Sequence, residues 1–241
     1  MGGRFLILFG RDPAREARVK GFDASGAEDL FASFAFGWLQ AAEEAGARLV
    51  VATPAEDVAA WRARLPSDRR ILWICQRGRS FGERLEESAR RVALWGGSAV
   101  VVGGDVPPCA RSARRAFDAL DSGANAVLAP APDGGVSLVG LGVADLDLLR
   151  GLAAGSRGVF DALARGLAAR GRSVALVGFA PDVDGRRDLR RLLRSRKLSD
   201  LRSLARRALA VLRPLPQTRR SEPRSLLLGG PSGLRAPPAS A

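Results

Sequence analysis

The sequence of 241 residues contains no histidine and no tyrosine, and only two cysteines, Cys75 and Cys109. The absence of histidine excludes Ser-His-Asp and Cys-His nucleophile systems, histidine metal sites and histidine acid–base catalysis. Two cysteines this far apart in sequence exclude a zinc knuckle and a disulfide framework. Any chemistry must therefore come from carboxylates, Lys or Arg, hydroxyls and backbone amides, with or without a hard metal ion.

Long apolar runs are also missing. No stretch approaches the roughly twenty apolar residues of a membrane span. The opening run, residues 5–9, is shorter than the apolar core of a signal peptide and is followed at once by Arg11 and Asp12. These features predict a soluble, cytoplasmic protein.

The positive charge is concentrated at one end of the chain. Of the 38 Lys and Arg residues, fifteen follow residue 185, against three acidic residues there, so this segment carries +12 of the net +13. Residues 186–213 show leucines at helical spacing and predict a basic amphipathic extension. Residues 214–241, rich in Pro, Ser, Gly and Arg, are predicted to be disordered. Because the tail has no aromatic residues between its cations, we expect at most a non-specific contact with polyanions.

Short apolar runs alternate with helical patterns over residues 1–185. This alternation predicts one α/β domain with a mostly parallel sheet flanked by helices. A capping box at Ser25 and Glu28 predicts a helix that ends before Gly46, and Thr53, Pro54 and Glu56 repeat the device. The expected strands are residues 5–9, 49–52, 71–75, 99–102, 126–128, 136–141 and 174–177, and the other expected helices are 82–94, 111–120 and 159–169.

Two segments that follow expected strands carry groups suited to phosphate and metal. In an open α/β sheet, ligands bind beyond the carboxyl ends of the strands. The segment after the first strand holds Gly10, Arg11, Arg18 and Lys20, and these cations suit a phosphate or another acidic group; the alternative is a solvated charged loop. Asp105 follows the strand at 99–102 and two glycines, a favourable position for Mg²⁺ or Mn²⁺. Its alternative role is to cap the following turn.

Two further segments carry carboxylates after strands. Asp133 and Gly134 lie between two expected strands, where Asp-Gly most often serves as a turn. Asp182 and Asp184 follow the last strand. Because alternate residues of an extended segment point the same way, both carboxylates are placed to face one metal ion.

Taken in order, these segments resemble a known bacterial family, domain-of-unknown-function family 2064, also called selenodomain-associated transferase 1. Val19-Lys20 matches the start of the family's V-K-T-R-L, and Gly82-Glu83-Arg84-Leu85, preceded by Gln76, matches Q…G-D-L-G-E-R-L/M. Gly104-Asp105-Val106-Pro107 aligns with S-D-C-P. Residues 130–141 align with P-A-x-D-G-G-Y-x-L-I-G-L, and 182–189 with D-V-D-T-P-E-D-L. The resemblance covers about residues 4–192.

The resemblance implies a GT-A fold, similar to the nucleotide-diphospho-sugar transferases and to the molybdenum-cofactor and phospholactate guanylyltransferases. It implies a metal-dependent glycosyl- or nucleotidyltransferase that acts on a nucleotide sugar or a nucleoside triphosphate. Asp105 would hold Mg²⁺ or Mn²⁺, with Asp182 or Asp184 completing the metal site. The segment after the first strand would meet the nucleotide phosphates, with Lys20 as their principal cation and Asp105 and Lys20 as the catalytic pair. Asp133 and Gly134 would lie in the nucleotide site.

Several positions depart from the family pattern. Gly21 and Phe22 replace the Thr and the phosphate-facing Arg that follow the family's lysine, and Val136 replaces an aromatic residue. An alternative is therefore a degenerate relative that binds a ligand or a partner without catalysis. On the sequence alone, Arg11, Arg15 or Arg18 is placed to substitute for the lost arginine. Restoring the pattern with Gly21→Thr and Phe22→Arg is expected to tighten nucleotide binding.

Overall fold

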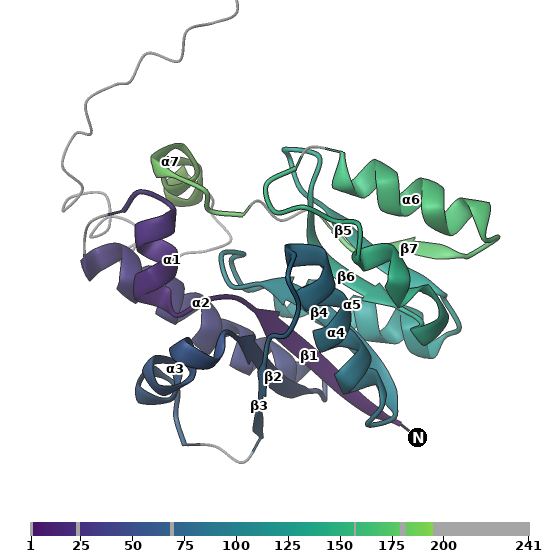
Figure 1. The fold of residues 1–241 in the computed structure, drawn as a ribbon, viewed down its shortest axis with the longest axis horizontal. Helices are drawn as coiled ribbons and strands as arrows, with labels where there is room; N and C mark the ends of the chain where they lie inside the picture. The colour runs from purple at the N-terminus through teal and green to yellow at the C-terminus, as the bar shows by residue number, and fades with distance from the viewer. Residues whose placement is uncertain (1, 23–24, 68–69, 157, 179–181, 195–241) are drawn as a thin grey trace, which may run out of the picture.

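A seven-stranded sheet forms the centre of the fold (Figure 1). The computed structural model describes residues 2–22, 25–67, 70–156, 158–178 and 182–194. The strands stand in the order β3-β2-β1-β4-β6-β5-β7. Their bounds are β1 Gly3–Phe9, β2 Arg48–Thr53, β3 Ile71–Cys75, β4 Gly97–Gly103, β5 Ala126–Pro130, β6 Val136–Leu141 and β7 Val174–Leu176.

The sheet is mixed but mostly parallel, which confirms the predicted fold class. β1 pairs in parallel with both β2 and β4, β2 with β3, and β5 with β7. β6 runs antiparallel to its neighbours β4 and β5. The chain leaves β1 toward β2 on one side and returns to β4 on the other side of β1. The carboxyl ends of β1 and β4 therefore form a topological switch point, where ligands bind in open α/β sheets.

Helices cover both faces of the sheet because successive strand residues point to opposite sides. On one face, Leu6 and Leu8 of β1 share a core with residues of α2, α3 and α5. On the other face, Ile7 and Phe9 share a core with residues of α4, η2 and α6. The helices are α1 Pro13–Val19, α2 Ser25–Glu44, η1 Ala55–Asp57, α3 Val58–Arg64, α4 Phe81–Ala93, α5 Ala110–Asp121, η2 Val143–Leu149, α6 Val159–Ala169 and α7 Arg186–Arg194. Within the described ranges, no helix has the length and apolarity that crossing a membrane requires.

The segment after β1 is a helix, whereas the sequence analysis treated it as a loop. Asp12 is the N-cap of α1, and its carboxylate accepts a hydrogen bond from the backbone N–H of Arg15. Pro13 follows at the first helical position, where its missing N–H costs nothing. This Asp-Pro pair was the available start signal. The helix fixes which of its cations face the ligand region.

The helix predicted to begin at Pro54 is also different. Thr53 ends β2, and its buried hydroxyl has no hydrogen-bond partner in the described part of the chain, so it does not cap a helix. Pro54 precedes a short 3₁₀ turn, η1, and the α-helix begins at Val58. The helix predicted from Ser25 is present and ends at Glu44, two residues before Gly46, whose φ of +65° suits a glycine stop.

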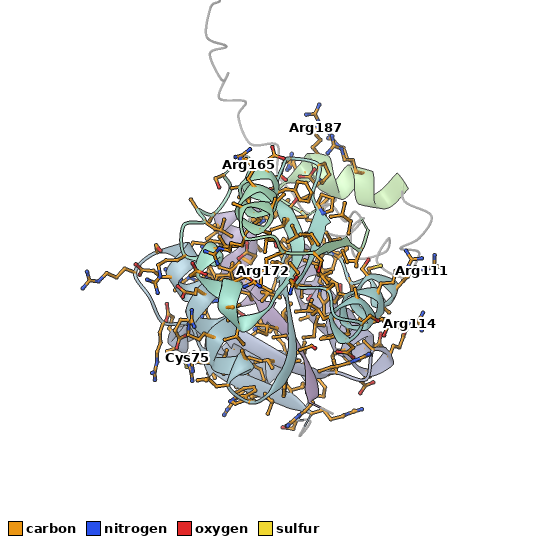
Figure 2. The ribbon with its side chains drawn as sticks, turned by 90° about the vertical axis from the view of Figure 1, so that its right-hand side faces the viewer. Cys75, Arg111, Arg114, Arg165, Arg172 and Arg187 are labelled. Atoms are coloured by element: carbon orange, nitrogen blue, oxygen red, sulfur yellow. The ribbon has the colours of Figure 1, made fainter. Side chains whose placement is uncertain are left out.

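The basic C-terminal extension is described only at its start. α7 covers Arg186–Arg194, and its Leu189 is buried. Figure 2 shows Arg187 on this helix directed away from the body of the domain. The rest of the predicted extension, from residue 195, and the segment 214–241 that we expect to be disordered lie outside the described residues.

Candidate metal and nucleotide site

A cavity of about 800 Å³ lies at the carboxyl ends of β1 and β4, at the switch point of the sheet. Small-molecule sites in proteins usually have volumes of about 300–1,000 Å³. Its wall includes the predicted residues Gly10, Arg11, Lys20, Asp105, Asp133, Asp182 and Asp184. The structure therefore gathers groups that are as much as 174 residues apart in sequence around one space.

Asp105 lies two residues after the end of β4, and close backbone packing holds its loop in place. A Cβ on Gly103 would lie 2.5 Å from a carboxylate oxygen of Asp105, so a side chain there would displace the carboxylate. The indole N–H of the buried Trp38 donates to the backbone C=O of Val106 over 2.8 Å. The aspartate thus stands on a loop supported by α2.

Asp182 and Asp184 lie beside Asp105 because the chain between them pairs with its loop. The backbone N–H of Val183 donates to the C=O of Asp105 over 3.0 Å, and the Val183 side chain is buried. Its two neighbours therefore point to the other side, toward the cavity. One carboxylate oxygen from each of the three aspartates lies within 4.8 Å of the others.

Lys20 reaches this group from the end of α1. Its ammonium donates hydrogen bonds to Asp105 and Asp184 and lies 3.8 Å from a carboxylate oxygen of Glu16. Burial lowers the pKa of Lys20, but the charges and hydrogen bonds of Asp105 and Asp184 outweigh it, and the net shift is upward. The lysine therefore stays cationic at neutral pH.

Of the three clustered aspartates, Asp182 is the one without a hydrogen-bond or ion-pair partner in the described part of the chain. Among the described residues it makes no hydrogen bond or ion pair. Burial, followed by the negative charges of Asp105, Asp184 and Asp133, raises its pKa to about 7. The negative charges of the three aspartates are therefore only partly balanced by Lys20, and an additional cation would stabilise them. Three clustered carboxylates are the hard oxygen ligands that Mg²⁺ and Mn²⁺ prefer, so these residues fit a divalent cation.

The charges around the cavity support the same conclusion. The formal charge of the titratable lining is −2, from six carboxylates and four cations. A nucleotide phosphate entering this space alone would meet net repulsion, which a divalent cation cancels. The carboxylates are Glu16, Glu56, Asp105, Asp133, Asp182 and Asp184, and the cations are Arg11, Arg15, Lys20 and Arg84.

Of Arg11, which precedes α1, and Arg15 and Arg18 within it, none both lines the cavity and lacks a carboxylate partner among the described residues. Arg11 pairs with Glu16 at 3.1 Å, and Arg15 pairs with Glu56 at 2.7 Å and Asp57 at 3.3 Å. Arg18 is exposed and does not line the cavity. The expectation that Arg18 substitutes for the lost arginine is therefore wrong. Arg11 and Arg15 line the cavity, but each is already paired with a carboxylate.

Asp133 and Gly134 form the expected turn between β5 and β6. Asp133 accepts a hydrogen bond from the backbone N–H of Gly135 over 2.8 Å, and Gly134 has a φ of +88°. Asp133 and Gly135 line the cavity, but Gly134 does not. Gly134 therefore serves the turn, and its prediction as a nucleotide-binding residue gains nothing from its position.

Gly21 and Phe22 are structural, which changes the meaning of their departure from the family pattern. Gly21 follows the end of α1 with a φ of +73°, a conformation that is unfavourable for a β-branched threonine. Phe22 is buried and packs against Phe31, with ring centroids 6.1 Å apart. Restoring Thr and Arg here would strain the backbone and bury a charge, so this double substitution is not a usable test of nucleotide binding.

Sequence reasoning missed several polar residues of the cavity wall, among them Glu16, Gln76 and Arg84. Glu16 is buried, and burial followed by the charge of Asp105 raises its pKa; its i,i+4 spacing to Lys20 was the available signal. The Gln76 side-chain amide donates to the backbone C=O of Ala52 over 2.9 Å. Arg84 lies in the first turn of α4, and both it and Gln76 belong to a motif that the sequence analysis used only for alignment.

Solved structures similar to this chain show its fold, which is that of the nucleotide-diphospho-sugar transferases. A protein of Desulfovibrio desulfuricans assigned to these transferases has a TM-score of 0.73 at 21% identity, over 87% of this chain and 96% of that one. A Mycobacterium tuberculosis protein solved as a manganese complex has a TM-score of 0.54 at 18% identity, over 81% and 100%. The UTP-bound UGPase of Acinetobacter baumannii has a TM-score of 0.52 at 11% identity, over 88% and 100%.

A comparison with protein families matches a shorter part of the chain than the solved structures do and points to the family resemblance found from the sequence. Residues 38–156 match the family described as uncharacterized protein conserved in bacteria (DUF2064). This confirms the resemblance recognised from the sequence motifs. The matched segment contains Asp105 and Asp133 but not Lys20, Asp182 or Asp184. None of the curated proteins matches the chain in sequence.

Proposed function

We propose that this protein is a divalent-metal-dependent transferase that acts on a nucleotide sugar or a nucleoside triphosphate and transfers a glycosyl or nucleotidyl group. The observation that carries the proposal is the meeting of Asp105, Asp182 and Asp184 at the carboxyl end of β4, with Lys20 beside them. The manganese and UTP bound by two structures of the same fold support the metal and the nucleotide as ligands.

Each residue has a role in this proposal. Asp105, Asp182 and Asp184 would hold Mg²⁺ or Mn²⁺, which supplies charge neutralisation for the phosphates of the substrate and of the leaving group. Lys20 would donate to a phosphate oxygen, and Gly10 and Arg11 line the same wall. No step requires a side-chain nucleophile, in keeping with a sequence that lacks histidine and tyrosine.

A second candidate is a relative that binds a nucleotide without catalysis. One contact favours it: the Lys20 ammonium already neutralises Asp105 and Asp184. A lysine held in this way stabilises the metal-free site. The two candidates share a ligand and differ in turnover.

A thermal-shift panel tests both candidates on the full chain. Each nucleoside triphosphate and a set of nucleotide sugars are added with Mn²⁺, with Mg²⁺ or with a chelator. A ligand that binds the folded state raises the midpoint of unfolding. We expect at least one nucleotide to raise the midpoint only with the metal present. A separate assay for released pyrophosphate or nucleoside diphosphate then distinguishes a transferase, which releases one of them, from a non-catalytic relative, which releases neither. If no nucleotide shifts the midpoint with either metal, both candidates are wrong.

A further inference from the structure

Among the described residues, Arg84 is the cation of the cavity wall that makes no ion pair with a carboxylate. Arg11, Arg15 and Lys20 each pair with at least one acidic side chain. In the described ranges, Arg84 has no ion pair, and its Nη1 reaches only the backbone C=O of Arg79 at 3.5 Å. That distance is the limit for a hydrogen bond, so the contact is weak. Arg84 is a half-buried residue of the cavity wall with almost no partner among the described residues, so its guanidinium is available to an external anion.

The backbone beneath Arg84 is held firmly. Ser80 caps α4, and Glu83 completes a capping box with it. Gly82 packs so closely on η2 that a Cβ there would lie 2.3 Å from the backbone oxygen of Arg150. The carboxylate of Glu86, one turn after Gly82, binds the Arg150 guanidinium over 2.6 Å. The first turn of α4 is therefore fixed against its neighbour, and Arg84 with it.

Arg84 enters the cavity wall from a different helix than Lys20, the residue that binds Asp105 and Asp184. Arg84 stands on α4, which covers one face of the sheet, whereas Lys20 ends α1, and Figure 1 shows these helices well apart. Phe81, three residues before Arg84 and hence on the same side of α4, packs edge-on against Phe9, with ring centroids 5.6 Å apart. The acidic part of the cavity wall is formed around Asp105. The part formed by α4 places the cation Arg84 beside the apolar side chains of Phe81 and Phe9.

We propose that Arg84 binds the phosphate group of a phosphorylated second substrate, the molecule that reacts with the nucleotide. A guanidinium can donate two parallel hydrogen bonds to phosphate oxygens. In the described part of the chain, the guanidinium of Arg84 makes no ion pair with the carboxylates that we propose as metal ligands. That the phosphorylated molecule is a second substrate rests on the proposed function. The binding of a phosphate group by Arg84 does not depend on it. It makes Arg84 a residue that selects a substrate by charge.

The test measures binding of two phosphate probes to the full chain by thermal shift and calorimetry. Inorganic phosphate and glucose 1-phosphate are the probes, and glucose is the neutral control. The variants are Arg84→Gln, Arg84→Lys, which keeps the charge but loses the paired donors, and Arg79→Gln, a matched control on the exposed loop before α4. We expect glucose 1-phosphate to bind the native chain and Arg79→Gln alike. Arg84→Gln should bind it about tenfold to hundredfold more weakly, and Arg84→Lys should fall between.

Three results overturn this proposal. One is failure of both phosphate probes to bind the native chain, another is equal binding to Arg84→Gln, and the third is equal binding of glucose and glucose 1-phosphate. A separate titration with nucleotide and Mn²⁺ distinguishes it from the proposed function. We expect Arg84→Gln to keep nucleotide affinity; if it loses that affinity instead, Arg84 belongs to the nucleotide site and the separate subsite is wrong. If phosphate probes bind but no nucleotide does, the proposed function fails and the subsite stands.

Discussion

The ammonium of Lys20 donates a hydrogen bond to the carboxylate of Asp105, joining residues 85 positions apart in the chain. The same ammonium reaches Asp184, so one cation serves two of the three clustered aspartates. In the site we propose, a divalent cation uses the same oxygens. Lysine and metal therefore compete for them, and metal binding would free the ammonium to meet a phosphate.

Removing the lysine charge tests this competition. In Lys20→Met, Asp105 and Asp184 have lost their shared cation, so we expect a lower midpoint of unfolding in chelator and recovery when Mn²⁺ is added. Mn²⁺ affinity without nucleotide should rise by about tenfold, the equivalent of one charged hydrogen bond. Isothermal titration calorimetry measures it, with Arg18→Met, an exposed residue outside the cavity, as the control. An unchanged or weaker Mn²⁺ affinity in Lys20→Met would show that the two cations do not compete.

The support of the Asp105 loop by α2 gives a stability prediction. Trp38→Phe keeps the ring in the core but removes the donor to the Val106 carbonyl. We expect the free energy of unfolding to fall by about 1–3 kcal/mol, the cost of a buried polar group without its partner. Chemical denaturation measures it, with Trp95→Phe, a half-exposed tryptophan, for comparison. Equal losses in the two variants would mean that the hydrogen bond does not support the loop.

The ion pair between α4 and η2 gives a pH prediction. The hydrogen bond from Arg150 lowers the pKa of Glu86, burial opposes this, and the hydrogen bond from Arg90 adds to it. A lowered pKa means that the ionised carboxylate stabilises the folded state above its unfolded pKa of about 4.3. That stability is lost as the pH falls through the lower folded value.

Glu86→Gln should therefore lower the midpoint of unfolding at pH 7, and its difference from the native chain should shrink as the solution is acidified below about pH 4. At neutral pH we expect a loss of about 1.5–3 kcal/mol, typical of charged hydrogen bonds. Glu87→Gln is the matched control, because its ion pair with Arg91 is longer, at 3.6 Å. A pH-independent difference between native chain and Glu86→Gln would show that the charge of Glu86 is not the cause.

The strands and the sheet class were predictable because their signal is local. Val100 to Val102 and the similar run in β2 are continuous apolar segments, as strands buried on both faces require. The common direction of Asp182 and Asp184 was also predictable, because alternate residues of an extended segment point the same way. Their grouping with Asp105 was expected only from the family resemblance, since it depends on the long-range hydrogen bond between Val183 and Asp105.

The rest depends on tertiary pairing that the sequence does not express. Arg11, Arg15 and Arg84 look equivalent as letters, and only the carboxylates that surround each of them in the fold distinguish the two neutralised arginines from Arg84. Phe22 was compared with the arginine of the family motif, but its burial shows that the core determines this position. The segment of α1 was predicted as a loop because it is rich in charged residues. The Asp12-Pro13 pair, which is typical of a helix start, indicates the helix that the structure shows.

In the site that we propose, Asp105 and its two neighbouring aspartates hold a divalent cation, and a Mn²⁺ titration of the full chain measures that binding. Calorimetry would compare the native chain with Asp105→Asn and with Asp118→Asn, a surface aspartate paired with Arg4 at 3.0 Å. We predict that the native chain and Asp118→Asn bind Mn²⁺ equally, and that Asp105→Asn binds it about tenfold more weakly or less well still, with its fold intact. Equal Mn²⁺ affinity in all three proteins would contradict the claim and leave Asp105 as a structural cap.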